Sequence, residues 1–144
     1  PTKLNIEQYI KSSDNGEVMY RKTTCDGETK YTEITKINTG INNERIKKRR
    51  NISENEYYSH IPTTETPIRK VRYCFDYNEQ NFRLDIFDDG LKLLEIEDTN
   101  KTRKRNIPDY LSVIENVTTN ETYRNSSIYS KKNTKNKTKE KIAS

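Results

Sequence analysis

The stretch "NFRLDIFDDGLKLLEIE", residues 81–97, decides the fold. Arg83 and Asp85 alternate with apolar residues in its first half, and Glu95 and Glu97 do so in its second half, after the turn signal "DDG". Successive residues of a β-strand face opposite sides of the sheet. The stretch therefore predicts a β-hairpin with one charged face and one apolar face.

The same alternation recurs in other parts of the chain, and it predicts a mainly antiparallel β-sheet. The exception is Lys36, which shares its parity with Ile34. One interpretation is an open sheet whose charged face lies in water. The other is a closed barrel with the charges inside, where about eight cations would meet few carboxylates and would need an anionic ligand. The cations that share the charged face in this reading are Arg21, Lys36, Arg45, Lys47, Arg49, Lys70, Arg72 and Arg83.

Composition limits the chain to one domain with a small core. Of its 144 residues, 29% are apolar and 34% are charged, and the net charge is +5. A basic excess of this size favours anionic partners without selecting one class. We expect a domain over residues 1–129 and a disordered Lys/Asn-rich tail over residues 130–144, where almost nothing apolar offsets the ordering entropy.

The two cysteines, Cys25 and Cys74, are too few for a disulfide framework, and with His60 as the only histidine a Cys/His zinc site is not expected. We expect an intracellular, cytoplasmic protein. No apolar run is long enough to cross a membrane, so no transmembrane segment is expected. Because the chain begins at Pro1 instead of methionine, we expect a fragment of a longer protein.

Local signals place the elements. Strands are expected over residues 4–10, 17–24, 29–37, 68–77, 81–87 and 91–98, and Asp26-Gly27 predicts a tight hairpin. Ser53 and Glu56 form a capping box that predicts a helix starting near Glu54, so the basic run before it ends a strand. Residues 107–117 are expected to form a second helix, opened by Pro108.

The residues that carry these patterns resemble the CYTH domains of the triphosphate tunnel superfamily. The similarity covers about residues 6–128 and rests on "IRKVRYCFDYNEQNFRLDIFDDGLKLLEIE" with "IPDYLSVIENVTTNETYRNSSI". The closest match is to the CYTH-like C-terminal half of eukaryotic proteins similar to the TRPL translocation defect protein. "VRYCF", "FRLDIF" and "GLKLLE" carry this narrower match.

The resemblance implies an α+β, mainly antiparallel fold: an eight-stranded β-tunnel with a basic lumen and short flanking helices. It also implies an upstream AAA-type P-loop domain and binding of GTP or a phosphoinositide, the latter consistent with a peripheral position at membranes. Members of the wider family hydrolyse inorganic or organic triphosphates. The family's first strand, Glu-x-Glu-x-Lys, has no match here, so the domain resembles one that lacks this strand. Its Arg-x-Glu-x-Glu strand corresponds to Arg45, Lys47 and Arg49.

Fewer carboxylates and more cations favour non-catalytic binding of a phosphorylated anion. In this first hypothesis Asp85 and Glu95 orient the arginines, and the phosphate-binding residues are Arg21, Lys36, Arg45, Arg49, Lys70, Arg72 and Arg83. The alternative is a metal-dependent triphosphatase in which Glu95, Glu97 and Asp85 hold Mg²⁺ or Mn²⁺. A nucleic-acid binder is the third hypothesis and the least favoured, because no recognised motif accompanies the basic runs.

Overall fold

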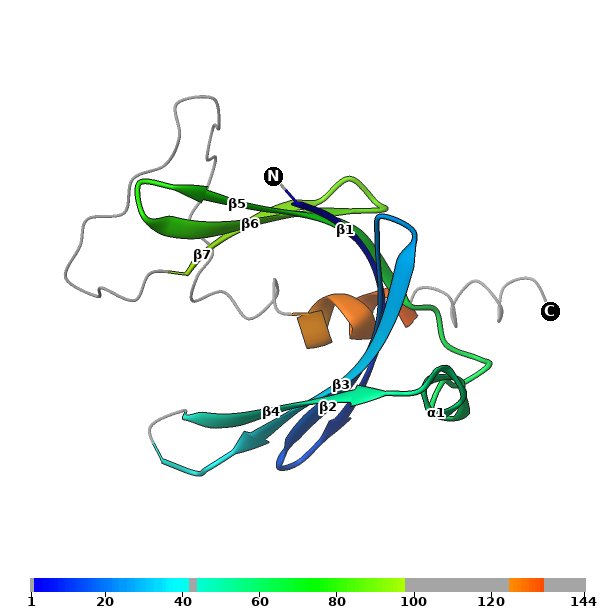
Figure 1. The fold of residues 1–144 in the computed structure, drawn as a ribbon. Coiled ribbons are helices and arrows are strands. Elements are labelled where there is room, and N and C mark those ends of the chain that lie inside the picture. Colours follow the sequence, from blue (N-terminus) through cyan, green and yellow to red (C-terminus); the bar gives the residue numbers. More distant parts are fainter. Residues whose placement is uncertain (1, 42–43, 98–124, 134–144) are drawn as a thin grey trace.

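A computed structural model describes residues 2–41, 44–97 and 125–133 of the chain. Seven strands form one antiparallel sheet in the order β4-β3-β2-β1-β5-β6-β7, and two short helices accompany it. Figure 1 shows the sheet bent into an open C. The elements are β1 (Thr2–Ser13), β2 (Gly16–Cys25), β3 (Glu28–Asn38), β4 (Arg45–Ile52), α1 (Glu54–Ser59), β5 (Ile68–Tyr77), β6 (Gln80–Phe87), β7 (Lys92–Glu97) and a helix over residues 125–133.

The predicted antiparallel β-architecture is confirmed, but the predicted closed barrel is wrong for the part of the chain that the structure describes. Strands β4 and β7 are the two edges of the sheet and do not pair with each other. Each strand runs antiparallel to its neighbour, so these two edges run in the same direction. An antiparallel barrel closes only with an even number of strands. Seven strands therefore leave an open trough.

Tight turns set the register of the hairpins. Asp26 and Gly27 both have positive φ values, 50° and 81°, and they join the paired residues Cys25 and Glu28. Two central residues with positive φ give the turn twist that matches the flanking strands. The predicted hairpin is thus confirmed.

Helix α1 begins where the capping signal predicts. The Ser53 side chain accepts a hydrogen bond of 3.1 Å from the backbone N–H of Glu56. Tyr57 is fully buried, and its ring lies 5.0 Å from that of Tyr31 on β3. Figure 1 shows α1 outside the bend of the sheet, so the side of β3 that carries Tyr31 is the outer face.

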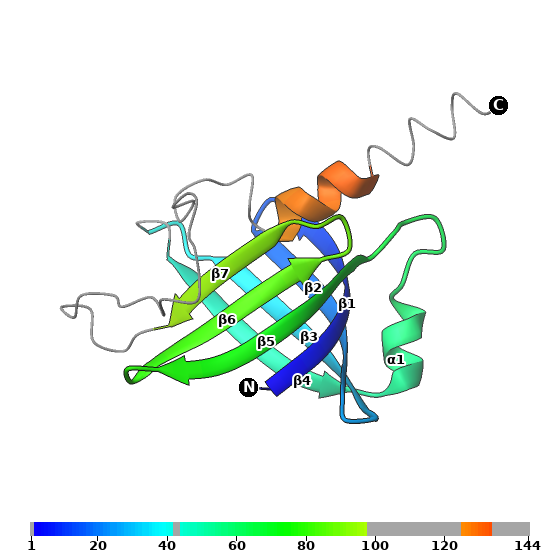
Figure 2. The ribbon, with the colours of Figure 1, turned by 90° about the horizontal axis from the view of Figure 1, so that it is seen from above.

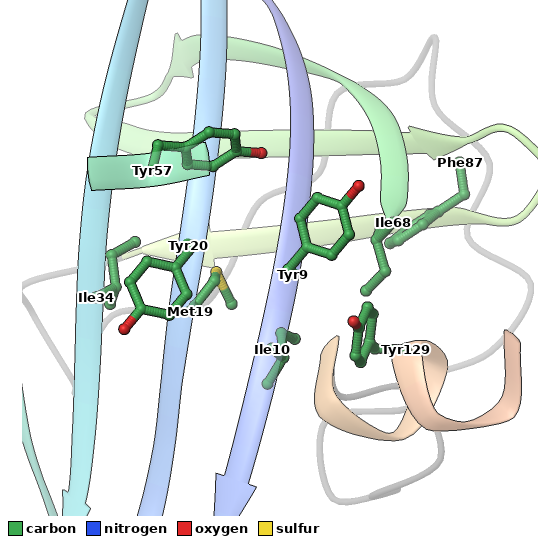
Figure 3. Packing of buried hydrophobic residues seen from close by; sticks show 9 residues of the cluster. All are labelled: Tyr9, Ile10, Met19, Tyr20, Ile34, Tyr57, Ile68, Phe87 and Tyr129. Carbon is green, nitrogen blue, oxygen red and sulfur yellow. The ribbon is translucent and has the colours of Figure 1, made fainter. Parts of the chain in front are cut away.

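The apolar core gathers where the sheet bends. Figure 3 shows its residues, which come from five of the strands, from α1 (Tyr57) and from the helix over residues 125–133 (Tyr129). The ring of Tyr129, from that helix, meets the ring of Tyr9 edge-on at 6.4 Å. Ile10, Met19 and Ile34 occupy neighbouring strands of the same row, and all three are buried. Burying this cluster ties both helices to the sheet.

The helix over residues 125–133 lies across one end of the trough (Figures 1 and 2). Lys132 of this helix pairs with Asp88 at 2.9 Å, and Asn133 bonds the backbone of Thr66. The expected tail begins at residue 130, whereas the helix continues to 133. The helix expected over residues 107–117 and the rest of the tail lie outside the described residues. Within the described ranges, no helix has the length and apolar character that crossing a membrane requires.

Candidate anion-binding site

The register of the sheet places the predicted cations on one side. Directly paired residues on neighbouring antiparallel strands share a face, and the pairs Gln8–Arg21, Arg72–Asp85 and Lys36–Lys47 connect the strands. Lys70 of this face hydrogen-bonds Asn125 of the helix that lies within the bend, so this is the inner face of the trough. The inner face carries Arg21, Lys36, Arg45, Lys47, Arg49, Lys70, Arg72, Arg83, Asp85 and Glu95.

The parity prediction is therefore confirmed, and Lys36 is not an exception to it. Lys36 lies opposite Lys47 on one side and Glu17 on the other. It shares parity with Ile34 because Ile34 also belongs to the inner face, where it packs into the apolar end of the trough.

Arg21 is a buried cation at the centre of this face. The residue is 8% exposed. Its Nε donates a hydrogen bond to Gln8 Oε1 at 3.0 Å, and its Nη2 lies 3.2 Å from Met19 Sδ. Among the described residues no carboxylate lies within salt-bridge distance of it. Burial, together with the charges of Arg72 and Arg49, lowers the pKa of Arg21 well below its ordinary value, to about 10. The charged form is thus poorly compensated.

Gln8 adds an unused hydrogen-bond donor beside this cation. It is fully buried, and its Oε1 is taken by Arg21, but its Nε2 has no partner in the described structure. A buried amide without a partner is costly.

Lys70, Arg72 and Asp85 form a second group of buried charges on the inner face, beside Arg21. Arg72 holds both oxygens of Asp85, Nε to Oδ1 at 2.7 Å and Nη2 to Oδ2 at 3.0 Å, and Lys70 Nζ lies 2.8 Å from Oδ2. Burial lowers the pKa of Lys70 to about 8, even though Asp85 acts in the opposite direction. Burial also raises the pKa of the Asp85 carboxyl, but its bonds to Arg72 and Lys70 outweigh this and lower it overall.

We call Arg21, Lys70, Arg72 and Asp85 the floor cluster. Each of the four is at most 8% exposed. Three cations and one carboxylate leave two uncompensated positive charges, and burying uncompensated charge is strongly unfavourable. The charge balance of the cluster among the described residues is therefore positive.

A second set of cations lies higher on the inner face, toward β4. The pKa of Lys47 is lowered by burial and then by the charges of Lys36, Arg49, Arg21 and Arg83. Arg83 comes from β6, so cations from opposite sides of the trough act on one another across it. Two of the predicted residues are instead paired: Arg45 with Glu17 at 3.0 Å, and Arg83 with Glu95 at 4.0 Å.

The predicted metal ligands do not form a metal site in the described structure. Both oxygens of Asp85 are held by Arg72 and Lys70, and Glu95 lies beside Arg83 with a side chain that is 63% exposed. Glu97 ends β7 opposite Asn81, and its side chain lies outside the described part. Asp85 therefore does not fit as a ligand of Mg²⁺ or Mn²⁺, because Arg72 and Lys70 already occupy both of its oxygens.

One cluster of metal-ligand types does occur among the described side chains, on the outer face. Glu33, Glu56 and His60 bring their ligand atoms within 4.8 Å of one another. Arg50 already bridges the two glutamates, at 3.2 Å to Glu33 and 2.6 Å to Glu56. The guanidinium supplies the positive charge there, and His60 stacks on Tyr20 at 4.5 Å.

Two residues of the inner face were not predicted from the sequence, Gln8 and Glu17. Gln8 has the parity of Ile6 and Ile10 in β1, so a polar residue within an apolar series was the signal that could have found it. Glu17 gave no such signal, because its buried position depends on Arg45 from β4.

Comparison with protein-family models, with curated proteins and with solved structures finds no match to this chain, so its function is argued from the geometry above.

Proposed function

We propose that this protein binds a phosphorylated anion in the trough without hydrolysing it. The observation that carries the proposal is the floor cluster with its two uncompensated buried charges, next to the unused amide of Gln8. Phosphate oxygens accept charge-assisted hydrogen bonds from guanidinium and ammonium groups, which are stronger than neutral ones. An anion bound there would replace the missing counter-charge.

The shape of the charged surface favours a polyphosphate or a multiply phosphorylated headgroup. The floor cluster would hold one phosphate, and the cations higher on the inner face would hold the next. Lys36, Lys47 and Arg49 extend the positive surface from the floor toward the β4 edge. A single phosphate would leave this second group of mutually repelling cations without a counter-charge.

Binding is favoured over metal-assisted hydrolysis by the state of the carboxylates. A triphosphatase needs oxygen ligands that hold a divalent metal against the substrate. Asp85 is engaged with Arg72 and Lys70, and Glu95 with Arg83, so their role in this proposal is to orient the cations.

The resemblance to CYTH domains belongs to the same proposal. A strand placed between β4 and β7, running antiparallel to both, would convert the seven-stranded trough into an eight-stranded antiparallel tunnel. The basic inner face would then be its lumen. A longer chain with a P-loop domain upstream, and a phosphoinositide as a membrane-located ligand, remain parts of this proposal.

The test is isothermal titration with inorganic triphosphate, GTP and a soluble phosphoinositide headgroup, each with and without Mg²⁺, at physiological salt. We expect binding that does not require Mg²⁺ and is lost in Arg21→Met. The matched control is Arg69→Met, which removes a cation from the outer face of β5, where Arg69 pairs with Glu7 at 3.3 Å. Triphosphate binding that requires Mg²⁺ and releases phosphate would overturn the non-catalytic proposal. No binding of any ligand would overturn the site.

A further inference from the structure

Strand β4 is an edge of the described sheet, and it is densely basic. It lies at one end of the open C (Figure 1). Five of the six residues from Arg45 to Arg50 are lysine or arginine, and every residue of β4 except Ile52 is exposed. Among the described strands β4 pairs only with β3. One side of its backbone therefore faces no other strand of the described structure.

The register between β3 and β4 determines which backbone groups of this edge are turned outward. The N–H of Thr39 donates a hydrogen bond of 3.1 Å to the C=O of Glu44, and the same register continues through both strands. In an antiparallel pair, hydrogen-bonded residues alternate with residues whose N–H and C=O groups point away from the partner strand. Arg45, Lys47 and Arg49 therefore turn these groups away from β3, where an added strand could bond them.

The side chains of β4 give this edge a positive charge that is only partly balanced. Arg45 and Arg50, at the two ends of the basic run, form ion pairs with glutamates. Among the described residues, no carboxylate lies within salt-bridge distance of Lys47, Lys48 or Arg49. Burial and the neighbouring cations lower the pKa of Lys47, so these charges repel one another. A strand that carries carboxylates would supply the missing negative charge.

We propose that β4 is the docking edge for an extended acidic segment of another protein, which adds to the sheet as an antiparallel strand. Basic residues on an edge oppose pairing with an identical edge, and the same residues attract a strand of opposite charge. Ile46, 49% exposed on the outer face, offers this strand an apolar contact. The β7 edge is not equivalent, because the exposed Glu95 would repel an acidic segment. The proposal does not rest on the anion site.

The probe is a capped synthetic peptide as long as β4 in which glutamate alternates with valine, titrated calorimetrically into the full chain. With its glutamates on the inner face, the peptide places carboxylates beside Lys47 and Arg49. We expect binding that weakens as the salt concentration rises, and Lys47→Glu should lower the affinity at least about tenfold. The matched control is Lys30→Glu, the same charge reversal at an exposed position of β3 beyond its pairing with β4, and it should change the affinity by less than about twofold.

Two further measurements distinguish strand pairing from attraction between charges alone. The peptide should slow the amide hydrogen exchange of Lys47 and Arg49 at least about tenfold, because their N–H groups gain partners. Directly opposite residues of an antiparallel pair share a face, so the glutamates of the peptide are the residues whose N–H groups face β4. N-methylation of these glutamates should abolish binding, whereas N-methylation of the valines should leave it.

Several outcomes would overturn the proposal. The first is no binding of the peptide, and the second is equal binding of a peptide with lysine in place of glutamate. The third is binding that leaves the exchange of Lys47 and Arg49 unchanged. Slow exchange of these two amides in the protein alone would also overturn it, because another segment would then occupy the edge. Failure of the triphosphate titrations would leave this test unaffected, since the peptide requires no residue of the floor cluster.

Discussion

Replacing the buried pair at the centre of the trough by apolar residues should stabilise the protein that holds no ligand. In the double variant R21M/Q8L the uncompensated guanidinium and the unsatisfied amide are both removed. Burial and neighbouring cations lower the pKa of Arg21 well below its ordinary value, to about 10. At about 1.4 kcal/mol for each pKa unit, the charged state is disfavoured by about 3 kcal/mol.

Two further contributions nearly cancel. Loss of the hydrogen bond from Arg21 to Gln8, 3.0 Å long, costs about 2 kcal/mol because its donor is charged. Removing the Gln8 amide, whose buried donor has no partner, raises the free energy of unfolding by about 2 kcal/mol. The net expectation is a gain of about 3 kcal/mol, in line with other replacements of buried charges by apolar groups. For a chain of this size the Tm should rise by about 6–12 °C.

The assay is urea unfolding followed by circular dichroism, with and without inorganic triphosphate. The ligand should stabilise the original protein, by about 2.7 kcal/mol at a hundred times the Kd, and should have no effect on R21M/Q8L. The matched control is R69M/E7L, which removes an exposed pair on the outer face and should change stability by less than about 1 kcal/mol. A loss of several kcal/mol in ligand-free R21M/Q8L would refute the reasoning, because it would mean that Arg21 already has a counter-charge.

Three further predictions follow from other parts of the sheet. Gly16→Ala should lower the free energy of unfolding in urea by at least about 3 kcal/mol, because Gly16 has a φ of 148° and a Cβ there would collide with the backbone of β3. The control is Gly27→Ala, at a φ of 81° where a Cβ meets open space, and it should lower the free energy of unfolding by only about 1 kcal/mol. Equal losses in the two variants would contradict the packing argument. The affinity for triphosphate should fall as the pH rises above about 8, where Lys70 loses its proton. Lys70→Met should abolish this decrease, and an affinity of the original protein that does not change with pH would contradict the prediction. In the ligand-free protein the sign is opposite: the folded pKa of Lys70 lies below its ordinary 10.5, so stability should rise between about pH 8 and pH 10.5. Asp85→Asn should cost about 3–5 kcal/mol in thermal or urea unfolding, because it leaves two buried cations unpaired, and triphosphate should restore part of the loss; a neutral effect would show that the pair is not buried.

Much of the fold followed from local sequence rules, and the reason is the period of two in a strand. That period fixed which side each of Arg21, Arg72 and Asp85 faces, and the positive φ values favoured by Asp26-Gly27 fixed one hairpin. The relation of Asp85 to the arginines was also expected from its parity, and the distances to Arg72 agree with it.

What the sequence could not supply depends on contacts between distant strands. Closure of the sheet depends on what meets the edges β4 and β7, and no residue within β4 or β7 encodes that. The depth of burial of Gln8 and Arg21 depends on curvature, which arises from the packing of Ile10, Met19 and the two helices. A metal site at Asp85 stayed open as the alternative hypothesis, because parity shows which face a carboxylate occupies but not which cations contact it.

Among the described strands β4 is an edge without a partner on one side, and this has a consequence for how the protein behaves at high concentration. Exposed sheet edges invite pairing with other chains, and lysine or arginine residues on the edge oppose it. Five of the six residues from Arg45 to Arg50 are basic, and all of β4 except its last residue is exposed. Two such edges should repel each other at low ionic strength and lose that protection as salt shortens the screening length to about 10 Å near 0.1 M. Solubility and self-association should therefore depend on ionic strength, and substitutions that neutralise β4 would make the protein more prone to form edge-to-edge aggregates.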